Sequence, residues 1–267
     1  MSTQYSDTDI VILAGARTPF GNFGGTLRDV SAVELAVAAS KGALARSGVA
    51  AEKIDDVVFG NCCHSSDDAI YLSRHIALKA GVPIGTPAMT VNRLCGSGLQ
   101  AIISAAQSLR LGETTYALAG GTESMSNVPH VIRGARWGLA LGQAPMSDAL
   151  WESLVDTYPG TPMAITAENL AEKYHVSREA SDEFALQSQE RAVSAVENGY
   201  FKEEIVPVEV KGPKGATVVV DRDEGPRAGM TMEKLAKLPA RFKQGGVVTP
   251  GNASGITDGA AAVVLTT

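Results

Sequence analysis

The sequence has no excess of positive charge and no lysine-rich run. Its 23 Lys and Arg residues are outnumbered by 29 Asp and Glu residues, so the formal net charge is -6 at pH 7. A protein that binds nucleic acid usually presents a basic face to the phosphate backbone, and this composition excludes that class of partner. A small polyanionic ligand is not excluded, because a few local cations are enough to bind it.

Cysteine is scarce as well, with residues only at positions 62, 63 and 95. These cysteines cannot build a disulfide framework, and free thiols are typical of a reducing compartment, so we expect a cytoplasmic protein. Residues 1–7 lack the basic start and apolar run of a secretory signal, and also the arginine-rich composition of a mitochondrial presequence. No apolar stretch is long enough to cross a bilayer, so we expect no membrane partner.

The sequence does contain an alternation of strand-like and helical patterns. With 45% hydrophobic and 19% charged residues in 267, the chain can bury a substantial core. Alternation of this kind is typical of a layered α/β fold with a mainly parallel sheet. We expect the first and third strands to be buried, the first on both faces. The expected strands are residues 9–14, 54–60, 88–92 and 116–120, and the expected helices are residues 31–48, 67–78 and 95–112.

After Gly121 this rhythm stops and a long irregular region begins. It contains two predicted helices, at about 166–174 and 177–198, and two strand-like runs, 205–210 and 217–220, joined by a Lys/Gly/Pro turn. A last apolar strand at 260–266 is expected to rejoin the first sheet. The predicted organisation is an α/β domain of residues 1–121 plus 247–267, with residues 122–246 as an inserted loop domain that covers the active site.

Cys95 lies where the predicted strand 88–92 turns into a helix, within the segment Asn-Arg-Leu-Cys-Gly-Ser-Gly at residues 92–98. Free amides and the positive end of the helix dipole favour a thiolate at such a position, and a thiolate attacks carbonyl carbon. The same amides could receive the oxygen of a thioester under attack. A free cysteine is more often a buried packing residue, but the strand, the turn and the small residues together favour a nucleophile.

Other candidate sites have simpler explanations. The run Cys62-Cys63-His64 has neither the spacer nor the second ligand pair of a zinc site, so we predict no metal and expect these residues to pack at a strand end near a cofactor or subunit contact. Residues 120–122 lack a phosphate-loop motif, and close backbone packing beside the cysteine loop explains the glycines better. Residues 248–255 are by composition a polar loop.

The segment at residues 92–98 resembles the acyl-accepting cysteine segment of thiolases, which make or split 3-ketoacyl-coenzyme A. The resemblance extends through residues 14–21, 119–126 and 258–263. Residues 66–72 and 162–171 are most similar to the mitochondrial type of 3-ketoacyl-CoA thiolase and its bacterial relatives. Biosynthetic acetoacetyl-CoA thiolases usually have a histidine where this chain has Pro162, so the resemblance favours longer or mixed acyl chains.

The resemblance also implies binding residues for coenzyme A. Ser254 matches the serine of a Gly-Asn-Ala-Ser-Gly segment that contacts coenzyme A in thiolases. Arg227 resembles the arginine that pairs with its nucleotide part, and Leu154 and Met163 fall where thiolases line the pantetheine channel. By residue pattern alone, Arg227 would be an exposed loop arginine, and Leu154 and Met163 would be ordinary packing residues.

By this resemblance, we expect a thiolase-like layered fold: a five-stranded mixed, mainly parallel sheet flanked by helices, with the cysteine helix buried at the centre and a long loop-domain insertion. The implied activity is acyl transfer through an acyl-cysteine on Cys95, forming or thiolytically cleaving 3-ketoacyl-CoA, including acetoacetyl-CoA, as in fatty acid β-oxidation. Coenzyme A thioesters would be substrates, with no metal or redox cofactor. A homodimer or homotetramer is expected.

Thiolases also carry a catalytic histidine in a Gly-His-Pro segment and a second cysteine in a Cys-x-Gly segment. Neither segment occurs in these 267 residues. We therefore expect this chain to be inactive by itself, with apolar faces left uncovered that promote self-association. Two alternatives stay open: a truncated non-catalytic fragment that binds acyl-CoA or dimerises, and a related condensing enzyme of the ketoacyl-synthase type.

Overall fold

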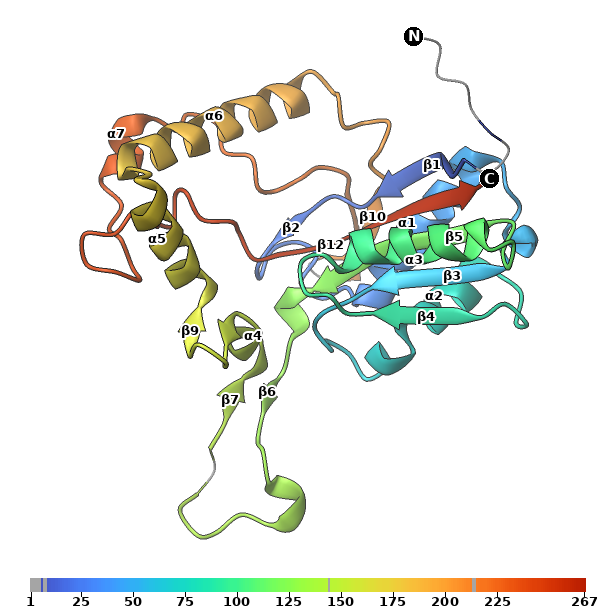
Figure 1. The fold of residues 1–267 in the computed structure, drawn as a ribbon, viewed down its shortest axis with the longest axis horizontal. Coiled ribbons are helices and arrows are strands. Elements are labelled where there is room, and N and C mark those ends of the chain that lie inside the picture. The colour runs from blue at the N-terminus through green and yellow to red at the C-terminus, as the bar shows by residue number, and fades with distance from the viewer. Residues whose placement is uncertain (1–5, 7–8, 144, 213–214) are drawn as a thin grey trace. The chain divides into compact units, whose positions relative to one another are not determined.

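The computed structural model describes residues 6, 9–143, 145–212 and 215–267, and these residues form two compact units (Figure 1). Unit 1 comprises Met1–Asn127, Lys202–Glu224 and Ile256–Thr267. Unit 2 comprises Val128–Phe201 and Gly225–Gly255. No helix in the described part of the chain is long and apolar enough to cross a membrane.

Unit 1 is a mixed sheet with helices on both faces. Its strands are β1 (Val11–Arg17), β2 (Gly21–Asn22), β3 (Asp56–Gly60), β4 (Ala88–Val91), β5 (Ala117–Ser124), β10 (Val208–Lys211), β11 (Thr217–Val220) and β12 (Thr257–Thr266). Its helices are α1 (Ala32–Ser47), α2 (Leu72–Ala80) and α3 (Ser97–Arg110), with short 3-10 turns at Ala51–Lys53, Ala69–Tyr71 and Met125–Asn127.

The main strands are ordered β1-β12-β5-β3-β4, and the short β2 pairs with β12. β3 runs parallel to both β4 and β5, whereas β12 runs antiparallel to β1 and to β5. Among the described main strands, β12 alone therefore opposes the common direction, which confirms the expected mixed, mainly parallel sheet. The last strand rejoins the first sheet as predicted, and its backbone bonds join the two ends of the chain into one layer.

The two faces of the sheet are covered by different helices, as Figure 1 shows. Side chains of a strand point alternately to its two faces, so Val57 and Phe59 pack with α1 and α2, while Val58 between them packs with α3. Both faces are therefore built from neighbouring residues of the same strands. Strand β3 is buried on both sides, which explains its nearly continuous apolar sequence.

Local signals in the sequence set the ends of α1 correctly. The Ser31 hydroxyl accepts a hydrogen bond from the Glu34 amide at 3.2 Å, and the Glu34 carboxylate accepts one from the Ser31 amide at 3.0 Å. This capping box satisfies two amides that would otherwise lack partners. Gly48 ends the helix with φ +70°, a conformation that costs glycine little.

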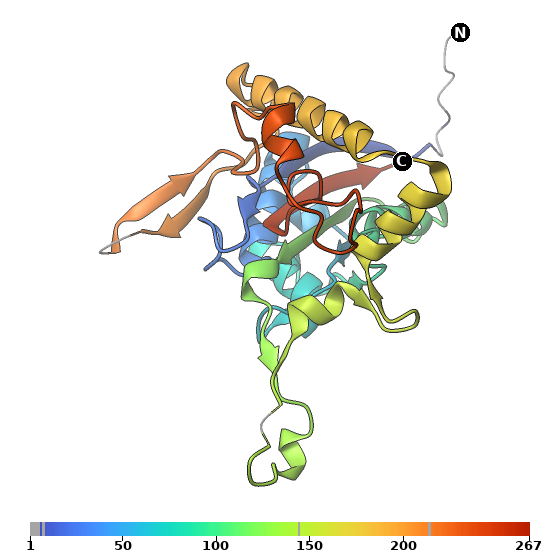
Figure 2. The same ribbon diagram turned by 90° about the vertical axis from the view of Figure 1, so that its left-hand side faces the viewer.

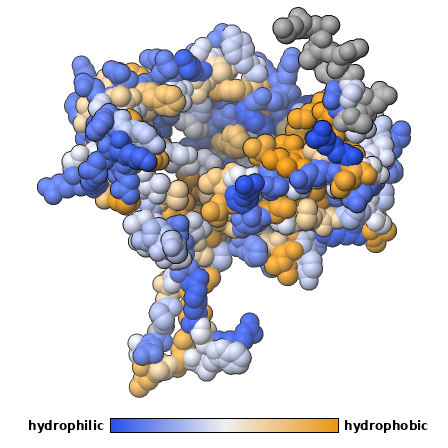
Figure 3. All heavy atoms as spheres, in the orientation of Figure 1, coloured by the Kyte–Doolittle hydropathy of each residue, from blue (hydrophilic) through white to orange (hydrophobic). Residues whose placement is uncertain are grey.

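The predictions of burial for β1 and β4 are wrong. The Ile12 side chain on β1 is 57% exposed, and Met89 on β4 is 48% exposed. Both strands lie at edges of the sheet, and the apolar cluster beneath α3 is built from the inner strands β3, β5 and β12. α3 is also not fully buried, because Leu99 and Ile103 on its outer side remain exposed. Figure 3 shows apolar surface gathered over unit 1.

Unit 2 combines a 20-residue helix with shorter elements, and few of its described apolar side chains are buried. Its helices are α4 (Ala149–Ser153), α5 (Met163–Tyr174), α6 (Arg178–Glu197) and α7 (Met232–Ala236), with a 3-10 turn at Ala135–Trp137. Its strands form two small ladders, β6 (His130–Val131) with β7 (Ser147–Asp148), and β8 (Val155–Asp156) with β9 (Thr161–Pro162). The two predicted helices of this region, α5 and α6, are present, and Ser177 caps α6 as expected.

The boundaries between the two units differ from the predicted boundaries at residues 121 and 247. β5 continues through Ser124 because it pairs with β12 over its whole length. The hairpin β10–β11, an orange ribbon in Figure 2, belongs to unit 1 because Val208 and Val220 are buried in the core beside α1. Residues 247–255 belong to unit 2, which binds them through polar contacts. Residues 213 and 214 of the predicted turn lie outside the described residues.

Candidate active site

Cys95 lies on a tight turn between β4 and α3, with its side chain exposed. β4 ends at Val91 and α3 begins at Ser97, so Cys95 precedes the first helical residue by two positions. Between them, Leu94 has φ +50°, a left-handed conformation that costs a residue with a side chain about 1–3 kcal/mol. A strained turn with an exposed nucleophile at its tip is the arrangement expected for Cys95 from its position between strand and helix.

The strained conformation is held through the carbonyl oxygen of Leu94. This oxygen accepts hydrogen bonds from the Ser97 amide at 2.9 Å, the Ser97 hydroxyl at 2.5 Å and the Cys62 thiol at 2.9 Å. The Ser97 hydroxyl also accepts a hydrogen bond from the Arg93 amide at 2.8 Å. Ser97 is buried and its side-chain bonds are partly shielded from water, whereas the Cys62–Leu94 bond is exposed.

Glycines allow the turn to lie close against the strand ends. A Cβ atom on Gly60 would come within 2.4 Å of the Ser97 backbone, and one on Gly121 would lie 3.1 Å from the Cα of Gly98. Gly60 pairs in register with Val91 and with Gly121, so β3 and β4 end together beside the turn, next to Gly121 of β5. The predicted close backbone packing beside the cysteine loop is therefore confirmed for Gly121, whereas Gly120 packs against Ala261 and Phe59.

The amides at the start of α3 are only partly available to a substrate. The amides of Gly96 and Ser97 donate to the carbonyl oxygens of Arg93 and Leu94 within the turn, so the expectation that they are free is wrong for these two. Among the residues that the structure describes, no acceptor is bound by the amide of Cys95 or by those of Gly98 and Leu99 in the first turn. These groups are the remaining candidates for binding a developing oxyanion.

A network behind the turn was not predicted from the sequence. The carboxylate of Glu123, on β5, accepts hydrogen bonds from the amides of Cys62 and Cys63. Burial raises the pKa of the Cys62 thiol to about 11, although a hydrogen bond with Ser97 partly opposes this shift. Burial likewise raises the pKa of Glu123 above its usual range, against the lowering effect of the two amides. Cys62 is therefore a protonated thiol at neutral pH.

His75 is held by neighbouring side chains. The ring of His75 stacks on Tyr71 and lies 3.1 Å from an Asp68 carboxylate oxygen, which is a structural role. Within the described ranges, no group of three or more His, Cys, Asp or Glu side chains is arranged to hold a metal ion. Cys62 and Cys63 instead lie just after the end of β3, as expected. The Cys62 side chain reaches the turn, whereas Cys63 contacts Glu123 through its backbone amide.

In unit 2, the structure brings Leu154 and Met163 together. The Met163 amide, at the start of α5, donates to the Leu154 carbonyl oxygen at 3.1 Å. The Leu154 side chain is half-buried, and that of Met163 is exposed. An apolar pair of this kind can line a channel for a flexible ligand arm. The contact arises from the β8–β9 ladder, whose long-range pairing no pattern in the sequence revealed.

Arg227 and Ser254 are both exposed residues of unit 2. The Arg227 amide donates to the Gln189 side chain at 2.8 Å, which ties its loop to α6. Its guanidinium group forms no ion pair among the described residues, so it can bind a phosphate or stack on a base. The Ser254 hydroxyl lies in the polar loop that precedes β12.

Buried carboxylates hold the loop that carries Ser254. Glu168, only 3% exposed, accepts hydrogen bonds from the amides of Val247 and Val248 at 2.9 and 2.8 Å. Asp182, 2% exposed, accepts a hydrogen bond from Asn252 at 2.8 Å and pairs with Arg178 at 2.7 Å. These bonds fix the loop from Val247 to Asn252 against α5 and α6.

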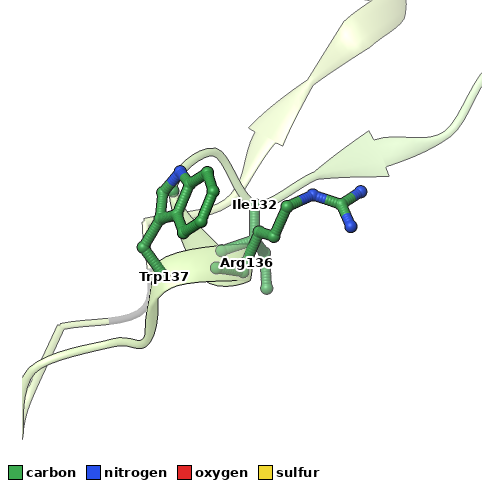
Figure 4. A pocket seen from close by; sticks show the side chains of 5 residues that line it. Ile132, Arg136 and Trp137 are labelled. Carbon is green, nitrogen blue, oxygen red and sulfur yellow. The ribbon is translucent and has the colours of Figure 1, made fainter.

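Two hollows occur in unit 2. One of about 580 Å³ is lined by Ile132, Gly134, Ala135, Arg136 and Trp137, and Figure 4 shows the Arg136 and Trp137 side chains pointing to different sides. The other, of about 300 Å³, lies between α5 and the loop before Asn252. Neither is lined by a thiol or a carboxylate group, so neither has the groups of an acyl-transfer centre.

Comparison with known proteins gives a consistent assignment. The family model described as "Thiolase, N-terminal domain" matches residues 10–267. The mitochondrial 3-ketoacyl-CoA thiolase of Bos taurus is 50% identical over 257 residues, covering 96% of this chain and 64% of that protein. The β-ketothiolase BktB of Cupriavidus necator is 47% identical, covering 96% of this chain and 65% of that protein.

Solved structures agree with these matches. The crystal structure of human mitochondrial 3-ketoacyl-CoA thiolase superposes with a TM-score of 0.93 at 48% identity, covering 97% of this chain and 65% of that chain. The fold is therefore that of the α/β class to which these relatives belong. The chain belongs to the thiolase family, and it spans 64–65% of the length of the relatives named here.

Proposed function

We propose that this chain takes part in thiolase-type acyl transfer and that Cys95 carries the acyl group. The observation that supports this most directly is the exposed Cys95 on a strained strand-to-helix turn, with an amide that binds no acceptor in the described residues. Family membership supports the same role, because residues 92–98 match the acyl-accepting segment of thiolases. Both lines of support concern the same sulfur atom.

In the proposed reaction, the Cys95 thiolate attacks the carbonyl carbon of an acyl-CoA or a 3-ketoacyl-CoA. The carbonyl electron pair moves to oxygen, where the backbone amide of Cys95 and those of the first turn of α3 can donate hydrogen bonds. Collapse of this intermediate expels the coenzyme A thiolate from an acyl-CoA, or the carbanion of acetyl-CoA from a 3-ketoacyl-CoA, and leaves an acyl-cysteine. Coenzyme A, or the carbanion of acetyl-CoA, then attacks the acyl-cysteine and restores the thiolate.

Coenzyme A binding is proposed for four residues of unit 2. Arg227 supplies an unpaired guanidinium for phosphate or adenine, and the exposed Ser254 hydroxyl supplies a hydrogen bond. Leu154 and Met163 supply an apolar wall for the pantetheine arm. A solved structure described as human mitochondrial 3-ketoacyl-CoA thiolase in complex with CoA, 47% identical with a TM-score of 0.91, supports this assignment. No metal or redox cofactor enters the proposed reaction.

The proposal also covers acyl-chain preference, location and oligomeric state. Pro162 favours longer or mixed acyl chains, as in β-oxidation, and relatives of this chain include mitochondrial 3-ketoacyl-CoA thiolases. A cytoplasmic location is supported by three free cysteines, while the mitochondrial relatives favour an organelle instead. A homodimer or homotetramer is supported by the exposed apolar side chains on β1 and α3.

The proposal is tested by labelling the 267-residue chain with iodoacetamide and measuring the modified cysteine by peptide mass spectrometry. We expect slow, selective labelling of Cys95 that the Cys95→Ala variant loses. Equal labelling of that variant would show that the reactive thiol is another residue. With acetoacetyl-CoA and coenzyme A, we expect no turnover by this polypeptide alone, because it contains no Gly-His-Pro histidine. Multiple turnovers would contradict that expectation.

A further inference from the structure

The Leu94 peptide group connects the turn network to the nucleophile. A peptide group is planar, so the Leu94 carbonyl oxygen and the Cys95 amide hydrogen point in opposite directions from one rigid plane. Donors that hold this oxygen therefore fix the direction of the Cys95 amide and the position of the Cys95 Cα atom. Ser97 and Cys62 supply these donors, at 2.5–2.9 Å from the oxygen.

The two residues that donate to this oxygen come from different parts of the chain. Ser97 belongs to the turn itself, so its bonds close the turn locally. Cys62 follows β3, and its amide is bound by Glu123 on β5, so its thiol joins the turn to the sheet. The Asn92 side chain also donates to the Cys62 carbonyl oxygen at 3.3 Å. Cys62 is thus the side chain that anchors the turn to neighbouring strands.

We propose that Cys62 is a positioning residue for Cys95: its thiol donates a hydrogen bond to the Leu94 carbonyl and holds the strained turn that presents the nucleophile. This inference rests on the proposed role of Cys95. The thiol must be protonated to act as a donor, and the raised pKa of Cys62 meets that requirement at neutral pH. Cys62 itself then stays unreactive beside a reactive cysteine.

The test compares three variants of the 267-residue chain. Cys62→Ala removes the donor, Cys62→Ser keeps a hydroxyl donor of similar size, and Cys63→Ala makes the same truncation at the adjacent, buried cysteine. The rate constant for iodoacetamide labelling of Cys95 is measured across neutral and mildly alkaline pH, together with the thermal unfolding midpoint of each variant.

We expect Cys62→Ala to lower the labelling rate by about threefold to tenfold, the range that loss of one modest hydrogen bond produces. Cys62→Ser should restore the wild-type rate and its pH profile, and Cys63→Ala should leave both unchanged, whatever its effect on the unfolding midpoint. The proposal is overturned if Cys95 in Cys62→Ala reacts at the wild-type rate. It is also overturned if Cys62→Ser and Cys62→Ala lower the labelling rate of Cys95 by the same factor.

The two possible failures are distinguishable. If wild-type Cys95 reacts no faster than Cys62 or Cys63, the proposed function itself fails. If wild-type Cys95 reacts selectively but Cys62→Ala does not change its rate or pH profile, only the positioning role fails.

Discussion

The two units of this chain are stabilised by different kinds of interaction. Unit 1 buries large apolar side chains on both faces of its sheet, including Phe59 and Leu118 on one face and Val58 and Leu265 on the other. In unit 2, among the described residues, the buried apolar side chains are those of Leu150, Ala171, Leu235 and Val248. Its geometry depends instead on buried carboxylates that bind backbone amides and a side-chain amide.

This difference matches two demands of the proposed acyl transfer. The proposed nucleophile needs one fixed geometry, and unit 1 provides it by close packing that resists deformation. The candidate coenzyme A residues lie on loops of unit 2, which are held by a small number of strong polar bonds. Loops of this kind commonly carry binding residues on a more rigid framework. Substitutions that remove side-chain volume should therefore destabilise unit 1 most, and substitutions that remove a buried charge should destabilise unit 2 most.

The largest expected effect is on the core of unit 1. Phe59 is fully buried between the sheet and the α1–α2 layer, so Phe59→Ala should lower the free energy of unfolding by about 3–5 kcal/mol. Urea denaturation followed by circular dichroism measures this loss. A change below about 1 kcal/mol, the size usual for an exposed position, would contradict the packing account.

The next effect is on the polar framework of unit 2. Glu168→Ala leaves the buried amides of Val247 and Val248 without acceptors and should cost about 2–4 kcal/mol, with faster hydrogen exchange at both amides. The matched control is Glu172→Ala on the same helix. Its side chain is 73% exposed and pairs with Lys243, so its loss should cost less than about 1 kcal/mol. If both variants lost the same free energy of unfolding, the claim that buried carboxylates stabilise unit 2 would be contradicted.

The smallest effect concerns the carboxylate of unit 1 that lies beside the nucleophile turn. Burial raises the pKa of Glu123, so folding favours its protonated form. Its contribution to stability is therefore present below its unfolded pKa and is lost as the pH rises through the raised folded pKa. The difference in unfolding free energy between wild type and Glu123→Gln should fall as the pH is raised from acidic to neutral. A difference that grows with pH would have the wrong sign.

Local signals explain which parts of the fold could be predicted from the sequence. The start of α1 follows from Ser31 and Glu34, and its end follows from Gly48. Each of these residues acts only on the helical turn next to it. The turn at Cys95 was predicted for the same reason, since strand, cysteine and helix follow each other along the chain.

Features that depend on long-range pairing could not be predicted. Ile12 is exposed because β1 lies at an edge of the sheet. A run of apolar residues looks the same in the sequence of an edge strand and of a central strand, so it does not predict this exposure. The role of Cys62 depends on β3 lying between β4 and β5. The contact between Leu154 and Met163 depends on a two-residue ladder with no pattern of its own.

The central claim is that Cys95 accepts an acyl group from a thioester. It is tested most directly by incubating the 267-residue chain with acetyl-CoA and locating any acetyl group by peptide mass spectrometry. The account predicts a thioester-linked acetyl group on Cys95 that is absent from the Cys95→Ala variant. An acetyl group on Cys62 or Cys63 in place of Cys95, or an undiminished adduct in Cys95→Ala, would contradict it.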